Sequence, residues 1–361
     1  MGLGSKTRII VAMSGGVDSS VAAALLVDQG FDVIGITIKT FCFTHAESGG
    51  KTCCGLDGIT DARRVAGTLG IPHYVYDMEE SFTRSVIDDF VHEYAAGRTP
   101  NPCVRCNSNT KIPHLLERGR RLGADLVATG HYARTDCAQD GTIRVLRGRD
   151  DAKDQTYFLW AMPRQVVRSL RFPVGHLTKP EVRAVARGLG LVTADKPESQ
   201  EICFVPSGDY AGFLEQRLGS DHSALRAGEL VTAHGEVIGQ HGGYGRYTVG
   251  QRRGLGGGRG APLYVLGVVP ETNRVVVGAR DELFRRDLML RDLNWIDQPP
   301  HLGEKLGVQI RHRASEVEAE VVSFDAAEIE LRLAQPQRAI TPGQSGALYR
   351  GEALIGGGRI A

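Results

Sequence analysis

The sequence predicts an α/β protein in three parts: an open parallel sheet with helices, a small glycine-rich β module, and a C-terminal antiparallel β-barrel. Strand-like apolar runs alternate with helical patterns up to about residue 206. Between residues 228 and 270, 13 of 43 residues are glycine, and short strands of alternating polarity follow from about residue 280. We therefore expect domains at residues 1–210, 211–280 and 281–361, which suits a chain of 361 residues.

The expected elements follow one another in an order typical of a parallel sheet. In the first part, strands are expected at 8–13, 31–39, 73–77 and 126–129, and helices at 17–29, 59–69, 81–94 and 111–122. In the last part, strands are expected at 305–310, 316–323, 329–333, 346–349 and 352–356. Open parallel sheets bind ligands at the carboxyl ends of their strands. Chemistry is therefore expected in the loops after Met13, Lys39 and Thr129.

Composition excludes several classes of protein. Hydrophobic residues make up 42% of the chain and charged residues 24%, so a disordered or fibrous protein is excluded. The net charge of +1 gives no overall signal for nucleic acid or membrane. The chain has no uninterrupted apolar stretch of about 18 residues and no secretory signal, so we expect a cytoplasmic protein without a membrane partner. Seven cysteines in such a protein favour catalysis, metal binding or redox chemistry over a disulfide framework.

The segment from Ala12 to Ser20 has the features of a phosphate-binding loop. It lies between an expected strand and an expected helix, where backbone N–H groups and the positive helix end attract anions. Its glycines, Gly15 and Gly16, allow close backbone approach, and Ser14, Ser19 and Ser20 offer hydroxyl groups. Asp18 is a candidate ligand for Mg²⁺. The plainer alternative is a serine-capped helix after a tight turn.

Two other nucleotide motifs fail on spacing. Gly50, Lys51 and Thr52 match the end of a Walker A motif, but His45 stands where its first glycine belongs. The glycines from Gly254 to Gly260 do not have the dinucleotide-binding spacing and do not follow the first strand. By contrast, SGGVDSS at 14–20 resembles the loop of ATP pyrophosphatases. These enzymes split ATP to AMP and pyrophosphate while they adenylate a substrate oxygen.

Three cysteines stand out by their surroundings. Cys103 and Cys106 form a CxxC pair in a proline-punctuated loop, and a helix is expected to follow, which lowers the pKa of a nearby thiol. Cys203 is the third. For Cys42 and Cys137 we expect only the role of buried cysteines. Cys53 and Cys54 could join the CxxC pair around zinc, but adjacent cysteines are poor joint ligands for one tetrahedral ion.

Seven motifs together carry a family resemblance. In chain order they are SGGVDSS at 14–20, GRTPNP at 97–102, ATGHY at 128–132, KDQTYF at 153–158, EICF at 201–204, TVGQR at 248–252 and TPGQS at 341–345. This series resembles the bacterial tRNA-specific 2-thiouridylases of the MnmA type over nearly the whole chain. The resemblance implies ATP-dependent replacement of the C2 oxygen of the wobble uridine by sulfur, in tRNAs for Lys, Glu and Gln.

The resemblance also implies roles for individual residues. ATP and Mg²⁺ are the expected cofactors, and a sulfur-relay protein or a cysteine desulfurase is the expected donor of persulfide or sulfide. Cys203 carries the persulfide, Cys106 is its partner thiol, and Asp18 acts in catalysis. Nucleotide contacts are implied for Ala12, Met13, Ser14, Gly15, Gly16, Val17, Asp18, Ser19, Ile38 and Gly130. Contacts with tRNA, including the flipped base, are implied for Asn101, Pro102, Cys103, His131, Lys153, Asp154, Gln155, Arg311, His312 and Gln344.

One position departs from the commonest pattern of the family and leaves two sulfur chemistries open. The family usually has Asp where this chain has Cys103. In one mechanism, Cys203 carries a persulfide and Cys106 closes the cycle by forming a disulfide, so Cys103 is a bystander. In the other, Cys103, Cys106 and Cys203 hold three irons of a four-iron, four-sulfur cluster whose fourth iron binds sulfide. The additional cysteine leads us to expect the cluster mechanism.

Local charge agrees with an RNA-binding face. Residues 139–190 hold ten Lys or Arg and five Asp or Glu, and residues 237–270 hold four Arg and no acid. The alternative is that acids elsewhere in the fold balance these charges. Two other functions stay open from the sequence: another adenylating synthetase built on the same loop, which needs neither Cys106 nor Cys203, and a tRNA-binding module that has lost catalysis.

Overall fold

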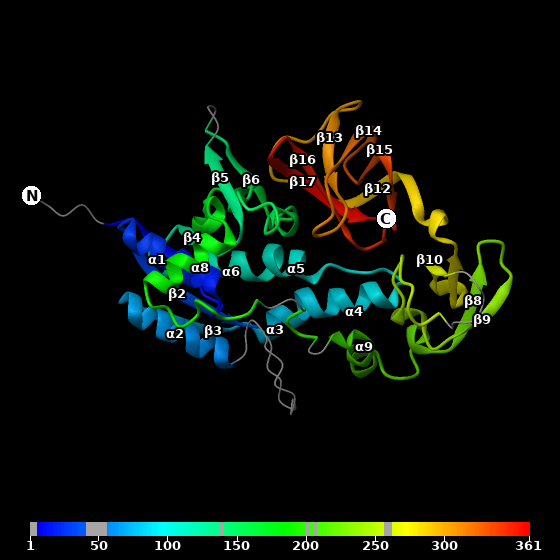
Figure 1. Ribbon diagram of the computed structural model, residues 1–361, viewed down its shortest axis with the longest axis horizontal. Coiled ribbons are helices and arrows are strands. Elements are labelled where there is room, and N and C mark those ends of the chain that lie inside the picture. The colour runs from blue at the N-terminus through cyan, green and yellow to red at the C-terminus, as the bar shows by residue number, and fades with distance from the viewer. Residues whose placement is uncertain (1–5, 41–55, 138–140, 199–201, 206–207, 256–261) are drawn as a thin grey trace, which may run out of the picture.

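The computed structural model describes residues 6–40, 56–137, 141–198, 202–205, 208–255 and 262–361 (Figure 1). The molecule is elongated, with the N-terminal α/β part at one end and the two β-rich parts towards the other. The predicted cysteine pair at 53–54, the Lys51 motif and Cys42 lie outside the described residues. No helix among those that are described is long and apolar enough to span a membrane.

A parallel sheet forms the centre of the N-terminal part, as predicted. Its strand order is β3-β2-β1-β4-β7, and all its pairings are parallel. Ile10 of β1 packs into one apolar cluster, whereas Ile9 and Val11 pack into another on the opposite face. Burial on both faces is what a parallel sheet covered by helices requires. The strands are β1 Arg8–Ala12, β2 Asp32–Lys39, β3 His73–Asp77, β4 Leu126–Ala128 and β7 Leu170–Arg171.

Helices cover the two faces of this sheet and extend beyond it. The α-helices are α1 Val17–Asp28, α2 Leu56–Leu69, α3 Glu79–Phe82, α4 Asp88–Ala95, α5 Pro102–Arg105, α6 Ile112–Arg121, α7 Arg164–Val167, α8 Lys179–Gly188 and α9 Tyr210–Leu218. Short 3₁₀ turns occupy Thr156–Phe158, Pro173–His176, Ser223–Leu225, Tyr244–Arg246, Pro270–Thr272 and Arg280–Leu283. Helices α1 and α8 share one apolar cluster, and α6 belongs to the cluster on the other face.

Two helical stretches contain a π-helical segment. Thr83–Ile87 joins α3 to α4, and Cys106–Lys111 joins α5 to α6. The two segments pack together, and the hydroxyl groups of Ser85 and Thr110 lie 2.6 Å apart. The helical stretch that we predicted to begin at Lys111 begins at Pro102. Proline suits the first helical position, because its missing N–H has no hydrogen-bond partner in the helix there. Wider π turns are frequent at functional sites, and here one begins at Cys106.

The C-terminal antiparallel barrel is confirmed, with six strands in the order β12-β15-β14-β13-β16-β17 and a closing pair between β12 and β17. Its strands are β12 Phe284–Trp295, β13 Lys305–Gln309, β14 Val317–Phe324, β15 Glu328–Arg338, β16 Ser345–Arg350 and β17 Ala353–Ile360. The sequence did not predict β12. It also did not predict the hairpin formed by β5 Ala133–Cys137 and β6 Ile143–Arg147.

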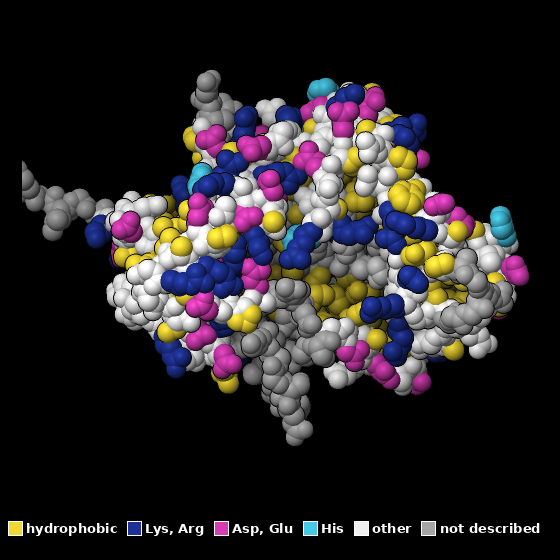
Figure 2. Space-filling view, in the orientation of Figure 1, with side chains coloured by type: hydrophobic (Ala, Val, Ile, Leu, Met, Phe, Trp, Pro, Cys, Tyr) yellow, Lys and Arg dark blue, Asp and Glu magenta, His cyan; other side chains and the backbone are white. Residues whose placement is uncertain are grey.

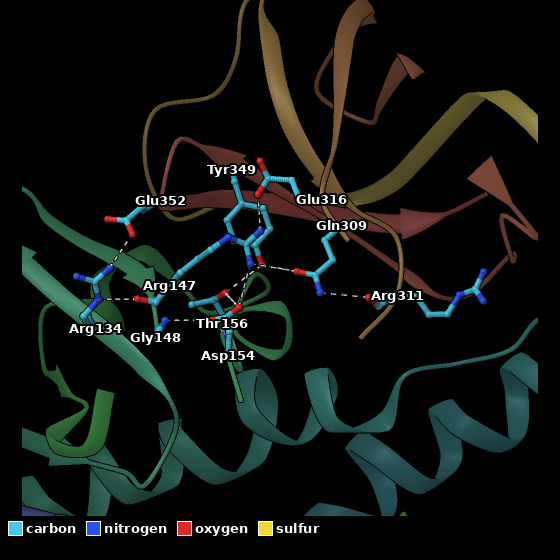
Figure 3. A network of polar contacts seen from close by, with 10 residues as sticks. All are labelled: Arg134, Arg147, Gly148, Asp154, Thr156, Gln309, Arg311, Glu316, Tyr349 and Glu352. Carbon is cyan, nitrogen blue, oxygen red and sulfur yellow. Dashed lines mark hydrogen bonds and ion pairs between the residues drawn. The ribbon is translucent and has the colours of Figure 1, made fainter. Parts of the chain in front are cut away.

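This hairpin joins the N-terminal part to the barrel. Strand β6 pairs with β17, where Val145 lies opposite Leu354. Arg147 then reaches across the joint, with ion pairs to Asp154 at 3.0 Å and Glu316 at 2.5 Å, and its guanidinium lies 3.7 Å from the centre of the Tyr349 ring (Figure 3). The barrel is thus fixed to the first half of the chain by both backbone and side-chain bonds.

The glycine-rich module contains a separate four-stranded sheet with its own apolar cluster. Strands β8 and β11 pair in parallel, and the other neighbours are antiparallel. The Tyr244 hydroxyl donates to the carbonyl oxygen of Ala95, which ties the module to the end of α4. Its strands are β8 Gly228–Thr232, β9 Val237–His241, β10 Tyr264–Val269 and β11 Arg274–Gly278.

A second joint connects the last barrel strand to α4. Arg359 of β17 is 14% exposed and pairs with Asp89 at 2.5 Å and with Glu93 at 3.1 Å. Asp89 also accepts hydrogen bonds from Arg105, which stands between Cys103 and Cys106. The carboxylates of α4 therefore hold both the barrel and the cysteine-bearing helix.

Replacing Arg359 by Met tests this joint. The change leaves the half-buried carboxylate of Asp89 and the buried carboxylate of Glu93 short of a partner, so we expect a loss of about 3 kcal/mol in the free energy of unfolding, measured by urea denaturation. The matched control is Arg291→Met. Arg291 lies opposite Arg359 in the β12–β17 pair, but its bridge to Glu328 is exposed, so the loss there is below about 1 kcal/mol. Equal losses in the two variants would contradict the role of the joint.

Candidate active site

The loop from Ala12 to Ser20 follows β1 and leads into α1, as predicted. The Met13 N–H donates to the carbonyl oxygen of Ile36 in β2, and the Thr37 hydroxyl donates to the carbonyl oxygen of Met13. Within the loop, the Ser14 N–H donates to Ser19 Oγ at 3.2 Å. Ser20 N donates to Gly16 O, so the N–H groups of Val17, Asp18 and Ser19 precede the helical bonds of α1. The loop thus presents a row of backbone donors at the carboxyl end of the sheet.

Two glycines allow this loop to pack closely. Gly15 has a φ of +73°, and the carbonyl oxygen of Gly58 fills the place that a Cβ would take. A Cβ on Gly130, after β4, would lie 2.6 Å from the Ser19 nitrogen. Gly130 therefore touches the phosphate loop itself, and Ile38 packs with Ala12 against the same apolar cluster. The structure thus brings four sequence-predicted nucleotide positions together around β1: Ala12, Gly15, Ile38 and Gly130.

Asp18 makes contacts that the sequence did not predict. Its carboxylate receives hydrogen bonds from Lys179 Nζ, at 2.8 and 2.9 Å, and from the Tyr132 hydroxyl at 2.8 Å. Lys179 is the first residue of α8 and is only 8% exposed. The side chain of Asp18 remains 31% exposed, so one side of the carboxylate faces outwards. Carboxylate oxygen is the ligand type that Mg²⁺ prefers, so Asp18 fits the predicted cation.

Further lysines surround the loop. Lys196 Nζ donates to the carbonyl oxygen of Gly15 at 2.9 Å and pairs with Asp61 at 2.6 Å. Glu198 pairs with both Lys179 and Lys153, each at 2.8 Å. Burial works to raise the pKa of Glu198, but the hydrogen bonds from Lys153 and Lys179 lower that pKa to about 2. Glu198 is therefore an anion at neutral pH.

His131 follows β4, is half-buried and is uncharged. Burial, and then the nearby charge of Lys111, lower the pKa of His131 to about 3. Its Nδ1 lies 2.7 Å from the Thr129 hydroxyl. His131 can therefore take part in hydrogen bonding at neutral pH, but it does not add positive charge for a phosphate group.

The three candidate cysteines have different surroundings. Cys103 is exposed on α5, whereas Cys106 and Cys203 are half-buried and pack against the same apolar cluster. Phe204 anchors the Cys203 segment in that cluster, with ring contacts to Phe82 at 5.7 Å and Phe90 at 5.1 Å. Cys106 and Cys203 thus pack against the same cluster, which is rich in aromatic side chains. Cys137, which we expected to be buried, is exposed.

The iron–sulfur cluster stays a prediction. Among the residues that the structure describes, no group of three or more His, Cys, Asp or Glu side chains is placed to hold a metal ion. Cys103 is exposed on α5, whereas Cys106 and Cys203 pack against one apolar cluster, which favours chemistry that uses these two thiols.

Comparison with known proteins places the chain in a family. Residues 7–207 match the family described as "tRNA methyl transferase HUP domain", 212–279 its "PRC-barrel domain", and 285–360 the "Aminomethyltransferase beta-barrel domain". Relatives named tRNA-specific 2-thiouridylase MnmA, from Geotalea uraniireducens and Geobacter metallireducens, are each 48% identical. These matches cover 98% and 99% of this chain and 95% and 97% of the relatives. The chain belongs to the MnmA family.

The names of the matches differ in the reaction that they mention. The domain descriptions name methyl transfer, whereas the MnmA relatives are named for thiolation. The relatives are the stronger guide to the family, because they are 48% identical over almost their full length. A solved structure described as a 4-thiouridine synthetase–RNA complex with bound ATP is 15% identical, and the match covers 59% of this chain and 51% of the chain in that structure, with a TM-score of 0.36.

In this MnmA family chain, several residues expected to contact tRNA make internal contacts. Gln344 donates to the carbonyl oxygens of Thr99 and Pro100, and Arg311 donates to those of Arg338 and Ala339. His312 packs 4.5 Å from the Phe158 ring. Gln155 accepts from the Tyr132 N–H, and Asp154 bonds Arg147, Gly148 and Thr156. These contacts hold the barrel, the 153–156 segment and the cysteine-bearing helix in fixed positions.

Between this helix and the barrel lies a cavity of about 200 Å³. Asn101, Arg105 and Ser108 line it from the helix side, and Asn294, Ser345 and Arg359 line it from the barrel. Pro102 is buried beside it. Polar side chains line much of this cavity, which suits an unstacked base or its phosphates better than an apolar ligand. On the face of the molecule drawn in Figure 2, Lys and Arg side chains surround a hollow with a hydrophobic floor near the middle.

Much of the basic excess at residues 139–190 is balanced within the fold. Arg144 pairs with Asp297, Arg149 with Glu181 and Arg187 with Asp195. Arg147, Lys153 and Lys179 have the acidic partners described above. The alternative interpretation, that acids elsewhere balance these charges, therefore holds for five of these six side chains, since Glu181 lies within the same segment as Arg149, and local charge counts overstate the positive surface.

Substitution of Gly130 by Ala tests the packing of the nucleotide loop. The new Cβ would lie 2.6 and 2.7 Å from backbone atoms of Ser19 and Asp18, so the loop has to shift. We expect ATP affinity to fall by about tenfold or more, measured by calorimetry. Gly188→Ala is the control, because a Cβ at this last residue of α8 would have no neighbouring atom within 4 Å. Unchanged ATP affinity in Gly130→Ala would separate Gly130 from the nucleotide site.

The ion pairs of Glu198 predict a pH dependence of stability. Since the pKa of Glu198 in the folded chain is lowered to about 2, its contribution is present above the unfolded pKa of about 4.5 and is lost as the pH falls towards 2. Urea denaturation of wild type and Glu198→Gln should show the variant less stable at pH 7. The difference should narrow as the pH falls from about 5 to about 3. A difference that does not change with pH would contradict the ion pairs.

Proposed function

We propose that this protein carries out ATP-dependent 2-thiolation of the wobble uridine in tRNAs for Lys, Glu and Gln. The observation that carries the proposal is 48% identity over almost the whole chain to relatives named tRNA-specific 2-thiouridylase. The phosphate loop after β1 and the packing of Cys106 and Cys203 against one aromatic-rich cluster support it. A cytoplasmic location agrees with a tRNA substrate. The proposed domains are residues 1–210 for catalysis, 211–280 as a linking β module and 281–361 for tRNA contact.

The first step in the proposal activates a poor leaving group. The C2 oxygen of uridine attacks the α-phosphorus of ATP, and pyrophosphate leaves. The donors of loop 12–20 hold the phosphates, and the neutral His131 and its Thr129 partner lie at the end of β4 beside them. Asp18 would hold Mg²⁺, which when bound neutralises phosphate charge. The oxygen then departs from the ring as part of AMP.

The second step transfers sulfur by way of two thiols. A donor protein supplies sulfane sulfur, so that Cys203 carries a persulfide whose terminal sulfur attacks C2 as AMP leaves. The Cys106 thiolate then attacks Cys203 Sγ, which releases 2-thiouridine and leaves a Cys106–Cys203 disulfide. An external thiol reductant restores both cysteines. This route matches the half-buried positions of Cys106 and Cys203 and leaves exposed Cys103 outside the reaction.

Recognition of tRNA is proposed for the surface between the barrel and the cysteine-bearing helix. Asn101, Pro102 and Cys103 would border the flipped uridine, beside the cavity lined by Arg105 and Arg359. The other residues proposed for this surface are Lys153, Asp154, Gln155, His131, Arg311, His312 and Gln344. Those that form internal hydrogen bonds, such as Gln344 with Thr99, would hold the surface in its conformation. Removing the barrel would also break its β6 pairing, so point substitutions test recognition more cleanly than truncation.

The products of ATP cleavage test the first step. With unmodified tRNA present, we expect AMP and pyrophosphate, measured by chromatography of labelled ATP. Asp18→Asn should reduce the rate by about a hundredfold or more, since it removes the charge of the carboxylate proposed to hold Mg²⁺ beside the phosphates. ADP and phosphate as products would contradict the loop assignment. AMP formed without any need for tRNA would favour a different adenylating synthetase.

Single cysteine substitutions test the second step. We expect Cys106→Ser and Cys203→Ser to abolish thiolation, while Cys103→Ser keeps most of it, as measured by mass spectrometry of digested tRNA. Cys137→Ser is the control, because that exposed thiol lies on the β5 strand. Loss of thiolation in Cys103→Ser, together with iron near four per chain after anaerobic reconstitution, would contradict the two-thiol route and restore the cluster mechanism.

A further inference from the structure

The phosphate loop carries no positive side chain of its own. Residues 12–20 read AMSGGVDSS, so the charged side chain within the loop is the carboxylate of Asp18. A triphosphate adds strong negative charge beside that carboxylate. Backbone N–H groups alone offer partial charges, and the lysine of a Walker A loop is missing here. A cation from another part of the chain is needed to balance the phosphates.

Lys179 is a buried ammonium group held at the first turn of α1. Its Nζ lies 2.8 Å from Asp18 Oδ1 and 2.8 Å from Glu198 Oε1, and the side chain is 10% exposed. Glu198 is bonded on its other oxygen by Lys153. Without nucleotide the four side chains, two acids and two lysines, are balanced. A buried ion pair of this kind adds little to stability compared with apolar packing, so its presence at the loop requires another explanation.

The two faces of the sheet indicate which part of ATP would lie near Lys179. Helices α1 and α8 cover one face, whereas the helix that carries Cys106 packs through α6 on the other. The uridine and the α-phosphorus have to meet on the side of the thiols. The departing pyrophosphate then points towards α1 and α8, where the Lys179 ammonium lies.

We propose that Lys179 binds the β- and γ-phosphates of ATP and stabilises the departing pyrophosphate, and that Glu198 holds the Lys179 ammonium when no nucleotide is bound. The proposal rests on the adenylation chemistry proposed above. It gives Lys179 the task of the absent loop lysine, from a position 161 residues along the chain from Asp18. Glu198 competes with phosphate for the same ammonium.

Comparing the binding of ATP and AMP tests this role, because AMP lacks the β- and γ-phosphates. Calorimetric titrations in EDTA, so that no cation bridges the ligands, give the ratio of the two affinities. In Lys179→Met we expect ATP affinity to fall by about tenfold or more, the loss of one charged hydrogen bond, with AMP affinity unchanged within about twofold. Lys179→Arg, which keeps the charge, should recover much of the ATP affinity.

Two further variants separate this role from a structural one. Arg187→Met is the matched control, because Arg187 lies on the same helix, α8, and forms an exposed ion pair of 2.8 Å with Asp195; ATP affinity should stay within about twofold. Glu198→Gln should bind ATP more tightly, by about threefold or more, since it removes the competitor for Lys179. That gain does not depend on how well Lys179→Met folds.

Each outcome decides one part of the proposal. Equal ATP affinity in wild type and Lys179→Met, or a parallel loss of ATP and AMP binding, would overturn phosphate binding by Lys179. Weaker or unchanged ATP binding in Glu198→Gln would overturn the competition by Glu198. Failure of the wild-type chain to bind ATP at all would instead overturn the proposed function.

Discussion

The geometry of the site depends on the ion pairs that the carboxylates of Asp89 and Glu93 on α4 form. Both carboxylates pair with Arg359 of the last barrel strand, and Asp89 also pairs with Arg105, which stands between the two cysteines. Barrel and thiols are therefore positioned by the same acids. A reaction on one base of a large RNA needs the surface that holds the RNA and the group that attacks it in fixed register. Here that register is set by buried charge pairs.

The charges around the nucleotide loop follow a related principle. Asp18, Lys179, Glu198 and Lys153 neutralise one another in the absence of ligand, so a site built to receive phosphates is kept in balance before they arrive. His131 is kept neutral by burial. Positive charge is therefore concentrated on lysines that approach from α8 and the segments near it, while the loop itself supplies backbone donors. In this arrangement, departure of pyrophosphate would return Lys179 to Glu198.

The local features of the fold were predictable from sequence, and the long-range ones were not. The phosphate loop and β1 depend on neighbours in the chain, so apolar runs and small residues were enough to locate them. Lys179 could not be found, because its contact with Asp18 spans 161 residues and a lone lysine at a helix start gives no signal. The start of the cysteine helix at Pro102 was missed because Asn101 and Pro102 were interpreted as loop residues. Strand β12 was missed because charged residues such as Arg285 and Arg286 accompany its buried Leu288 and Leu290.

Thiolation in this scheme depends on activation of the C2 oxygen of the wobble uridine by ATP. The most direct measurement uses tRNA whose wobble uridine carries ¹⁸O at C2, followed by mass spectrometry of the nucleotide products after one turnover. Direct adenylation forms a bond from that oxygen to the α-phosphorus, so the label should appear in AMP, and pyrophosphate should be unlabelled. Unlabelled AMP, formed while the tRNA becomes thiolated, would contradict direct adenylation.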